Sequence, residues 1–345
     1  MSRRIVILTE GHTNPRTAKT AANLVRYRPD EVLGLIDSTQ AGKTTEELLY
    51  VGGKTPIKAS LAEYPQANAL LLGIAPPAGR IPKAWRHVIL EAISRGMDVI
   101  SGLHDFLTED AEFTEAAARH GVTLTDVRKN KQRTLATRKG LDETCTRILT
   151  VGNDCSVGKM VTAIEISEGL QRAGYDAKFV ATGQTGIMVE GDGCPLDCVI
   201  ADFVSGAAEQ LVLDNQQHEF LLIEGQASLV HPAYSGVTLS LLHGTAPHAM
   251  ILCYEAGRTR VTGLKHLTLP PLKDVIYLTE MMAAVVQPAK VIGISMNSRE
   301  LTAEQAEQER ARVSNEFGLP VVDVFRHGPD ELVQAVLKLE REIAA

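Results

Sequence analysis

The sequence has no long hydrophobic run, few aromatic residues and no excess of positive charge. No apolar stretch reaches the roughly 18 residues that a membrane-spanning helix needs, and the short apolar stretch after Arg3 and Arg4 is too brief for a signal peptide. A net charge of −7 and an aromatic content of 4% argue against a nucleic-acid-binding protein, which needs a basic surface. We therefore expect neither a membrane nor a nucleic acid as partner.

Cysteine is also scarce. The five cysteines are an odd number without regular spacing, which favours reduced thiols and a cytoplasmic location over a disulfide-bonded secreted protein. Cys194 and Cys198 form the only close pair, beside Pro195 and without a second pair, and this spacing is a weak signal for zinc. We expect no resident metal ion.

The remaining composition is typical of a packed globular protein, and the length of 345 residues suits two domains. Short apolar runs alternate with segments of helical periodicity, which predicts the α/β class with parallel sheets. In residues 1–127 we predict strands at 4–9, 31–37, 69–74, 97–101 and 122–124, and helices at 16–27, 83–95 and 109–120. This is a Rossmann-like pattern, but the glycine-rich dinucleotide fingerprint is missing after the first strand.

A basic linker, residues 128–144, leads to a second predicted domain, residues 145–345. We interpret its charges as solvated, and the alternative is that some of them contact the phosphates of a long ligand. Beyond the linker we predict strands at 148–151, 177–181, 220–223, 249–253, 290–295 and 319–324, and helices at 159–172, 202–213, 302–317 and 330–342.

The most informative motif is a glycine-bounded loop between the strand that ends near Val151 and the helix that begins near Lys159. Strand, loop and helix N-terminus together are typical of a phosphate-binding loop, in which backbone N–H groups and the lysine hold phosphate oxygens. The residues predicted to bind a phosphate-bearing cofactor are Gly152, Asn153, Asp154, Cys155, Ser156, Val157, Gly158, Lys159 and Met160.

The loop differs from the usual phosphate-binding loop in two ways, and both affect which ligand we predict for it. Five residues separate Gly152 from Gly158, so that Asn153 stands at the usual first-glycine position. Met160 stands where a serine or threonine normally binds Mg²⁺, and a thioether is a poor ligand for so hard a cation. The loop is therefore expected to hold phosphates but to be poorly equipped for Mg-nucleotide hydrolysis. A second Gly42-Lys43-Thr44 lacks the upstream glycine, and we interpret it as a strand-to-loop connection.

Polar residues follow the neighbouring predicted strands, and the carboxyl ends of strands in such a sheet gather ligands. Glu224 ends an apolar strand, where it can order a metal ion, a water or an amine, or else serve as a helix cap or salt-bridge acid. His231 has a suitable ordinary pKa for a general base, although a lone histidine is as often a structural hydrogen-bonding group. Residues 182–186 are expected to form a flexible loop. The residues predicted to bind substrate are Gln184, Thr185, Gly186, Gln226, Ser228, Tyr234, Glu255 and Arg258.

The segments 152–160, 181–186, 224–228, 231–236 and 255–258 together resemble a bacterial family of two-domain proteins, one branch of which is the D-glutamate N-acetyltransferase type. The resemblance covers essentially the whole chain. It implies an N-terminal Rossmann-like domain, a C-terminal phosphate-loop domain, and acetyl transfer from acetyl-CoA to an acidic D-amino acid, with D-glutamate as the first choice. It also implies acetyl-CoA on the phosphate loop. For this reaction the chemistry of the residues predicts catalytic roles for Lys159, Glu224 and His231, with Arg258 on a substrate carboxylate.

The loop is also similar to that of dethiobiotin synthetase, which has the same five-residue gap but a threonine after the lysine. A Mg-ATP-dependent ligase or kinase is therefore the second hypothesis, and a non-catalytic nucleotide-responsive regulator is the third. Because apolar sheets of this kind often assemble, a homo-oligomer is expected.

Overall fold

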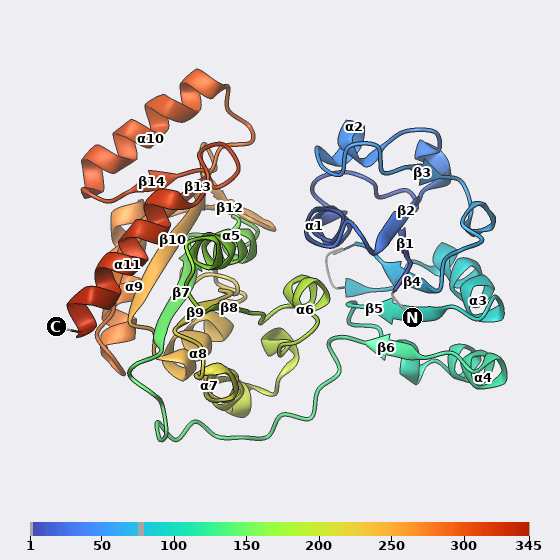
Figure 1. Ribbon diagram of the computed structural model, residues 1–345, viewed down its shortest axis with the longest axis horizontal. Coiled ribbons are helices and arrows are strands. Elements are labelled where there is room, and N and C mark those ends of the chain that lie inside the picture. The colour runs from blue at the N-terminus through green and yellow to red at the C-terminus, as the bar shows by residue number, and fades with distance from the viewer. Residues whose placement is uncertain (1–2, 75–78, 345) are drawn as a thin grey trace. The chain divides into compact units, whose positions relative to one another are not determined.

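The computed structural model describes residues 3–74 and 79–344, which divide into two compact units (Figure 1). The first unit contains the chain up to Lys129 together with Ile187–Gly191, and the second contains Asn130–Gly186 and the chain from Asp192 onward. Met1 and Ser2, where no signal peptide is expected, lie outside the described residues. Within the described ranges, none of the helices combines the length and the apolar character that a membrane span requires.

The first unit is built on a parallel sheet with the strand order β3-β2-β1-β4-β5-β6. This is the order of a Rossmann fold, and it confirms the predicted fold class. The strands are β1 (Ile5–Leu8), β2 (Val32–Ile36), β3 (Ile57–Lys58), β4 (Ala69–Leu72), β5 (Asp98–Ser101) and β6 (Leu124–Asp126). The helices are α1 (Lys19–Tyr27), α2 (Thr45–Leu49), α3 (Arg86–Ser94) and α4 (Ala111–His120).

The second Gly-Lys-Thr sequence opens the short helix α2. Thr44 is its N-cap, and the Thr44 hydroxyl and backbone N–H exchange hydrogen bonds with Glu47 in a capping box. Lys43 donates to the side chain of Gln40 at 2.8 Å. These polar groups are used to start a helix of five residues. The adjacent strand β3 was not predicted, because a strand of only two residues is too short to show a periodic pattern.

The second unit contains a parallel sheet with the order β14-β13-β10-β7-β9-β8 and a separate antiparallel hairpin, β11–β12. The sheet strands are β7 (Thr146–Gly152), β8 (Ala177–Val180), β9 (Phe220–Ile223), β10 (Ala249–Glu255), β13 (Lys290–Asn297) and β14 (Val321–Val322). The hairpin strands are β11 (Arg260–Val261) and β12 (Leu264–Thr268). The helices are α5 (Lys159–Arg172), α6 (Gln184–Glu190), α7 (Val204–Asn215), α8 (Ser235–Thr245), α9 (Leu272–Ala284), α10 (Ala303–Phe317) and α11 (Asp330–Ala344).

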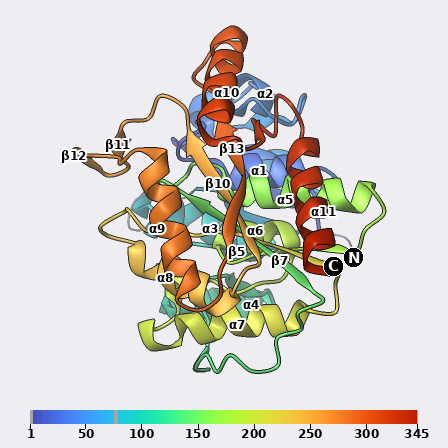
Figure 2. The same ribbon diagram turned by 90° about the vertical axis from the view of Figure 1, so that its left-hand side faces the viewer.

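Helices cover both faces of this sheet, as a parallel sheet requires. Figure 2 shows α8 and α9 on one side of β10 and β13, and α5 and α11 on the other. All seven residues of β7 are buried, and this central strand delivers the chain to the phosphate loop from the middle of the core.

One prediction for the second unit needs correction, and several of its elements were not predicted. Residues 182–186 are not a flexible loop, because helix α6 begins at Gln184. The helix is tightly placed: a Cβ on Gly186 would lie 2.4 Å from a carboxylate oxygen of Glu224, so only glycine fits. Helices α8 and α9 and the hairpin β11–β12 were not predicted at all.

The basic linker is exposed in its side chains but anchored through its backbone. The backbone N–H groups of Thr137 and Arg138 each donate to the buried carboxylate of Glu209 on α7, both at 2.8 Å. Close beside them, a Cβ on Gly206 would lie 1.9 Å from the carbonyl oxygen of Thr134. The linker is therefore packed against α7, and Gly206 is required for that contact.

Replacing two helical glycines tests this packing. Gly206→Ala should lower the stability of the second unit by about 1–3 kcal/mol, because the new methyl group overlaps the linker backbone. Gly236→Ala on α8 is the matched control, since a Cβ there meets nothing within 4 Å, and it should be neutral or stabilising by up to about 1 kcal/mol. Urea unfolding midpoints measure both changes, and equal midpoints for the two variants would contradict the contact.

Candidate functional site

The phosphate loop joins the end of β7 to the start of α5 in a conformation that needs glycine at Gly152 and Gly158. Gly158 has φ of +112°, in the left-handed region, and the non-glycine Ser156 also has a positive φ of 59°. A Cβ on Gly152 would lie 2.9 Å from Val157 and 3.1 Å from the Nζ atom of Lys159. The loop is thus wrapped closely around the lysine ammonium.

Lys159 is buried inside this loop. Its Nζ donates a hydrogen bond of 2.8 Å to the backbone carbonyl of Asp154, and its side chain is only 6% exposed. Burial lowers the pKa of Lys159, and the neighbouring Cys155, Cys253, Asp154 and Glu224 oppose that shift. An anionic ligand in the loop would supply the charge that a buried ammonium lacks.

The side-chain amide oxygen of Asn153, in the same loop, forms no hydrogen bond within the described residues. Its backbone N–H donates to the carbonyl of Cys253 at the end of β10, at 3.3 Å. Its side chain is 4% exposed, and in the described part of the chain the Oδ1 atom has no hydrogen-bond partner. Because a buried amide oxygen without a partner costs free energy, this atom is suited to accept a hydrogen bond from a ligand.

Glu224 lies directly after β9, almost fully buried. One of its carboxylate oxygens accepts hydrogen bonds from the backbone N–H groups of Thr182 and Gly183, at 2.9 Å and 3.0 Å. Burial nevertheless raises the pKa of Glu224 to about 7. The carboxyl group can therefore gain or lose a proton near neutral pH.

Two threonines that sequence analysis missed hold the strand ends around Glu224 together. The Thr182 hydroxyl donates to the Glu224 carbonyl at 2.6 Å and accepts from the Gln226 amide at 3.1 Å. The Thr150 hydroxyl accepts from the N–H of Gly225 at 2.9 Å. A threonine next to an apolar strand end is a weak sequence signal, because its partners are 40 or more residues away.

Arg258 and Glu255 form an ion pair beside the phosphate loop. The Arg258 guanidinium donates to the carboxylate of Asp154 at 3.0 Å, to the carbonyl of Cys155 at 2.7 Å, and to both oxygens of Glu255. Glu255 also pairs with Arg299. Both side chains thus brace the phosphate loop against the end of β10, and the role of Arg258 on a substrate carboxylate stays a prediction.

The imidazole ring of His231, predicted as a candidate general base, is held by hydrogen bonds at both of its nitrogens. Its Nε2 atom lies 3.0 Å from the carbonyl of Thr262, and its Nδ1 atom accepts from the N–H of Ala233 at 3.3 Å. Since a carbonyl can only accept and an N–H can only donate, the proton sits on Nε2 and both ring nitrogens are used. The ring is stacked on Tyr234 with centroids 4.7 Å apart. Both ring nitrogens of His231 are therefore hydrogen-bonded to the backbone, and its role as a general base stays a prediction.

The other predicted substrate residues shape the surrounding turns. Ser228 is fully buried and its hydroxyl accepts from the N–H of Val230 at 3.3 Å. The Gln184 amide donates to the hydroxyl of Thr185 at the start of α6, at 2.9 Å. Of the predicted residues, the structure brings the side chains of Lys159, Glu224 and Gln226 together and places the backbone of Gly186 against Glu224.

The potential metal-binding atoms near the loop are engaged in hydrogen bonds and an ion pair. Metal-binding atoms of Asp154, Cys155 and His231 lie within 4.8 Å of one another. However, Asp154 is occupied by Arg258 and by Thr262, and both nitrogens of His231 are hydrogen-bonded to the backbone. A cation there would have to break the ion pair and the histidine contacts.

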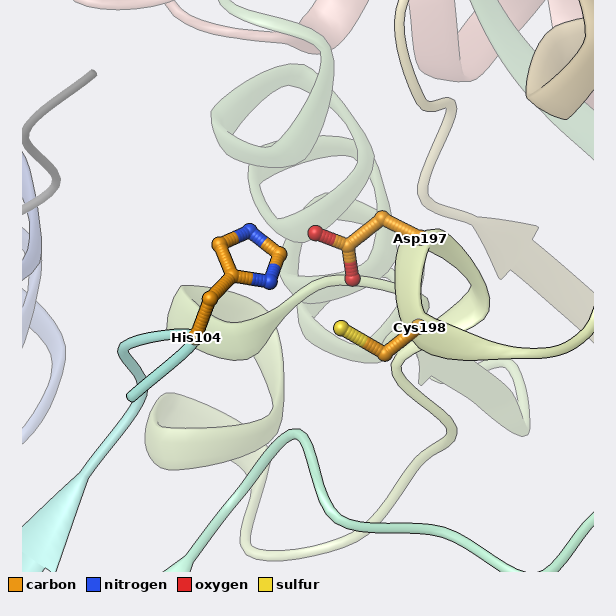
Figure 3. Close-up of side chains that lie close together, drawn as sticks. All are labelled: His104, Asp197 and Cys198. Carbon is orange, nitrogen blue, oxygen red and sulfur yellow. The ribbon is translucent and has the colours of Figure 1, made fainter. Parts of the chain in front are cut away.

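Cys194 and Cys198, the close cysteine pair in the sequence, are not part of the phosphate loop. Figure 3 shows Cys198 beside Asp197 on the short helix η6 (Leu196–Cys198), while the third labelled residue, His104, belongs to the other unit. Cys194 is buried, and burial raises the pKa of its thiol to about 11. Within the residues that the structure describes, Cys194 joins no group of three potential metal ligands.

Comparison with known proteins identifies relatives over nearly the whole chain. Residues 131–333 match a family model described as the DUF1611 C-terminal P-loop domain, and residues 38–130 match its N-terminal Rossmann-like domain. A crystal structure of a DUF1611 family protein from Anabaena variabilis superposes with a TM-score of 0.91 at 35% identity, covering 97% of this chain and 99% of that one.

Two curated relatives carry a functional name. A Pseudoalteromonas protein named D-glutamate N-acetyltransferase is 42% identical over 268 residues, which are 77% of this chain and 80% of its own. A Tritonibacter scottomollicae protein of the same name is 40% identical over 324 residues, 92% of this chain and 94% of its own. The resemblance predicted from the motifs is confirmed, and the chain belongs to the DUF1611 family of proteins with a Rossmann-like and a P-loop domain.

Proposed function

We propose that this protein is an N-acetyltransferase that moves the acetyl group of acetyl-CoA to the amino group of D-glutamate. The observation that carries the proposal is the similarity, at 40–42% identity over most of the chain, to two proteins named for this reaction. The site supports it in two ways, through the phosphate loop for the donor and through Glu224 for the acceptor.

The phosphate loop suits coenzyme A because it holds phosphates without equipment for splitting them. The backbone of the loop, the start of α5 and Lys159 together favour the diphosphate. Met160 follows the lysine and offers a thioether where Mg-nucleotide enzymes offer a hydroxyl. A diphosphate that remains intact during acetyl transfer needs no Mg²⁺ ligand at this position.

Glu224 suits the acceptor because an amino acid arrives as an ammonium ion and only the free amine attacks a thioester. A carboxylate with a pKa of about 7 can accept that proton near neutral pH. The unpaired Oδ1 atom of Asn153 offers a hydrogen-bond acceptor that would orient an N–H group. Glu224 is therefore the proposed general base, and Lys159 the phosphate-binding residue.

The proposal includes a cytoplasmic location and a homo-oligomeric state. All five cysteines are free thiols, which supports a cytoplasmic location. Helix α9 and its C-cap expose Tyr277, Met281 and Val285 at intervals of four residues, and this apolar stripe supports association into a homo-oligomer.

A thiol-release assay tests the reaction directly. Purified protein is mixed with acetyl-CoA and a panel of D- and L-amino acids, and free CoA is followed over time. We expect release with D-glutamate and much less with L-glutamate or with amino acids that lack an acidic side chain. Absence of release with every amine, together with magnesium-dependent ATP consumption, would contradict the proposal and favour the ligase hypothesis.

Removing the lysine ammonium tests the donor site. Lys159→Ala should raise the KM for acetyl-CoA by roughly 10- to 100-fold, the size expected for a lost charge-assisted hydrogen bond to phosphate. The KM for D-glutamate should change much less. Lys290→Ala, which removes a 78%-exposed ammonium at the start of β13, is the charge-matched control. An unchanged KM for acetyl-CoA in Lys159→Ala would remove the loop from the donor site.

The pH dependence of kcat tests the base. Because Glu224 must be ionised to accept a proton, kcat at saturating substrates should rise with pH through a midpoint near 7. Glu224→Gln should lower kcat by roughly 100-fold or more and abolish this rise. Glu168→Gln on α5, another carboxyl whose pKa is raised by burial, should keep it, as should His231→Gln. A pH profile that survives in Glu224→Gln but vanishes in His231→Gln would reverse the assignment.

A further inference from the structure

A strongly basic segment lies between β10 and α9. Residues 257–273, here called the basic hairpin, contain Arg258, Arg260, Lys265 and Lys273 and no acidic residue, in a chain of net charge −7. The segment forms the two strands β11 and β12, with Gly263 in the left-handed region at the turn between them. Figure 2 shows these strands projecting from the body of the second unit.

The turn of the basic hairpin, at Thr262, is fixed to the phosphate loop. The backbone N–H and the hydroxyl of Thr262 both donate to the Asp154 carboxylate, at 2.9 Å and 2.7 Å. Arg258 donates to the same carboxylate and to the carbonyl of Cys155. On its other side, the Thr262 carbonyl accepts the proton of His231. The turn of the hairpin therefore lies against the middle of the anion-binding loop, and Arg260 and Lys265 lie two and three residues from that contact.

Arg260 and Lys265, on the two strands of the basic hairpin, are left without an acidic partner in the described part of the chain. Arg260 and Lys265 are exposed, and across residues 3–74 and 79–344 no carboxylate forms an ion pair with either. The Arg260 guanidinium donates to the hydroxyl of Thr268 on the facing strand, at 2.8 Å, which orients it along the hairpin. Unpaired cations beside an anion site raise the local concentration of a polyanionic ligand.

We propose that the basic hairpin binds the 3′-phosphate of acetyl-CoA through Arg260 and Lys265 while the phosphate loop holds the diphosphate. The inference rests on the proposed function for the identity of the donor. Coenzyme A carries a phosphate monoester on the ribose next to its diphosphate, and the loop offers one ammonium for the diphosphate alone. The second phosphate group needs cations of its own, and a guanidinium binds a phosphate monoester through two parallel hydrogen bonds.

The test compares donors with and without this phosphate. In the full-length wild-type protein, KM for acetyl-dephospho-CoA should exceed KM for acetyl-CoA by about tenfold, the sum of two exposed charge contacts. Arg260→Ala/Lys265→Ala should lose most of this preference with kcat nearly unchanged. The charge-retaining Arg260→Lys/Lys265→Arg should keep most of it. Higher ionic strength should shrink the wild-type preference, because exposed charges are screened.

A charge-matched control separates a local contact from a general change in net charge. Lys338→Ala/Arg341→Ala removes two positive charges from the exposed side of α11, outside the basic hairpin, and should keep the full preference. Lys265→Ala alone provides a second variant, since its side chain makes no hydrogen bond within the described residues and its removal leaves the hairpin contacts in place.

A binding measurement that needs no turnover completes the test. By calorimetry, adenosine 3′,5′-bisphosphate should bind the wild-type protein about tenfold more tightly than adenosine 5′-monophosphate, and the Arg260→Ala/Lys265→Ala variant should bind the two alike. Acetyl transfer without any preference for the 3′-phosphate would overturn the hairpin assignment and leave the proposed function standing. A 3′-phosphate preference in binding, without acetyl transfer to any amine, would support the hairpin and overturn the proposed function.

Discussion

The buried carboxylate of Asp154 is the constraint on which the site depends. It is fully excluded from solvent, and an ionised carboxylate is tolerated there only when its oxygens are hydrogen-bonded. Its partners are the guanidinium of Arg258, the N–H and hydroxyl of Thr262, and the N–H of Cys155. Through them one side chain joins the phosphate loop, the end of β10 and the basic hairpin, and any change at Asp154 would displace all three.

Glu224 is the opposite kind of buried carboxyl group. Its hydrogen bonds come from the backbone N–H groups of Thr182 and Gly183 and from the side chain of Gln226, and among the described residues no arginine or lysine donates to it. Asp154 is held by a guanidinium and serves as a fixed joint, whereas Glu224 is free to exchange a proton. Two acids that follow neighbouring strands of one sheet thus take different roles because of the charges that surround them.

In the second unit, the strands and helices that are determined by the residues near them in the sequence were predicted closely. Strand β9 and helix α5 have the bounds expected from their apolar run and their periodicity, because a buried strand and a helix after a glycine loop are set by nearby residues. Helix α8 was missed because leucine and valine alternate irregularly with serine, threonine and glycine along it. Its sequence therefore shows little of the amphipathic pattern by which a helix is predicted.

The contacts of the candidate site that the sequence does not predict have a common physical cause, because their partners are far apart in the sequence. Nothing near His231 in the chain indicates that its ring nitrogen meets the carbonyl of Thr262, 31 residues later. Arg258 is separated by 104 residues from the carboxylate that occupies it. The residue types and the strand ends could be read from the sequence, but which side chains are free for a ligand depends on these tertiary partners.

The raised pKa of Glu224 links the charge of a ligand to the stability of the fold. Because the folded state holds this proton more tightly than the ordinary carboxyl pKa of 4.5 allows, the group stabilises the fold most at low pH. That contribution declines as the pH rises from 4.5 and is lost once the pH passes about 7. At pH 7 about half of the unliganded molecules therefore carry a buried carboxylate at this position, and a further cationic group placed beside it would favour the folded state. A bound ammonium ion would then act on the protein as a stabilising counter-ion before any bond is made or broken.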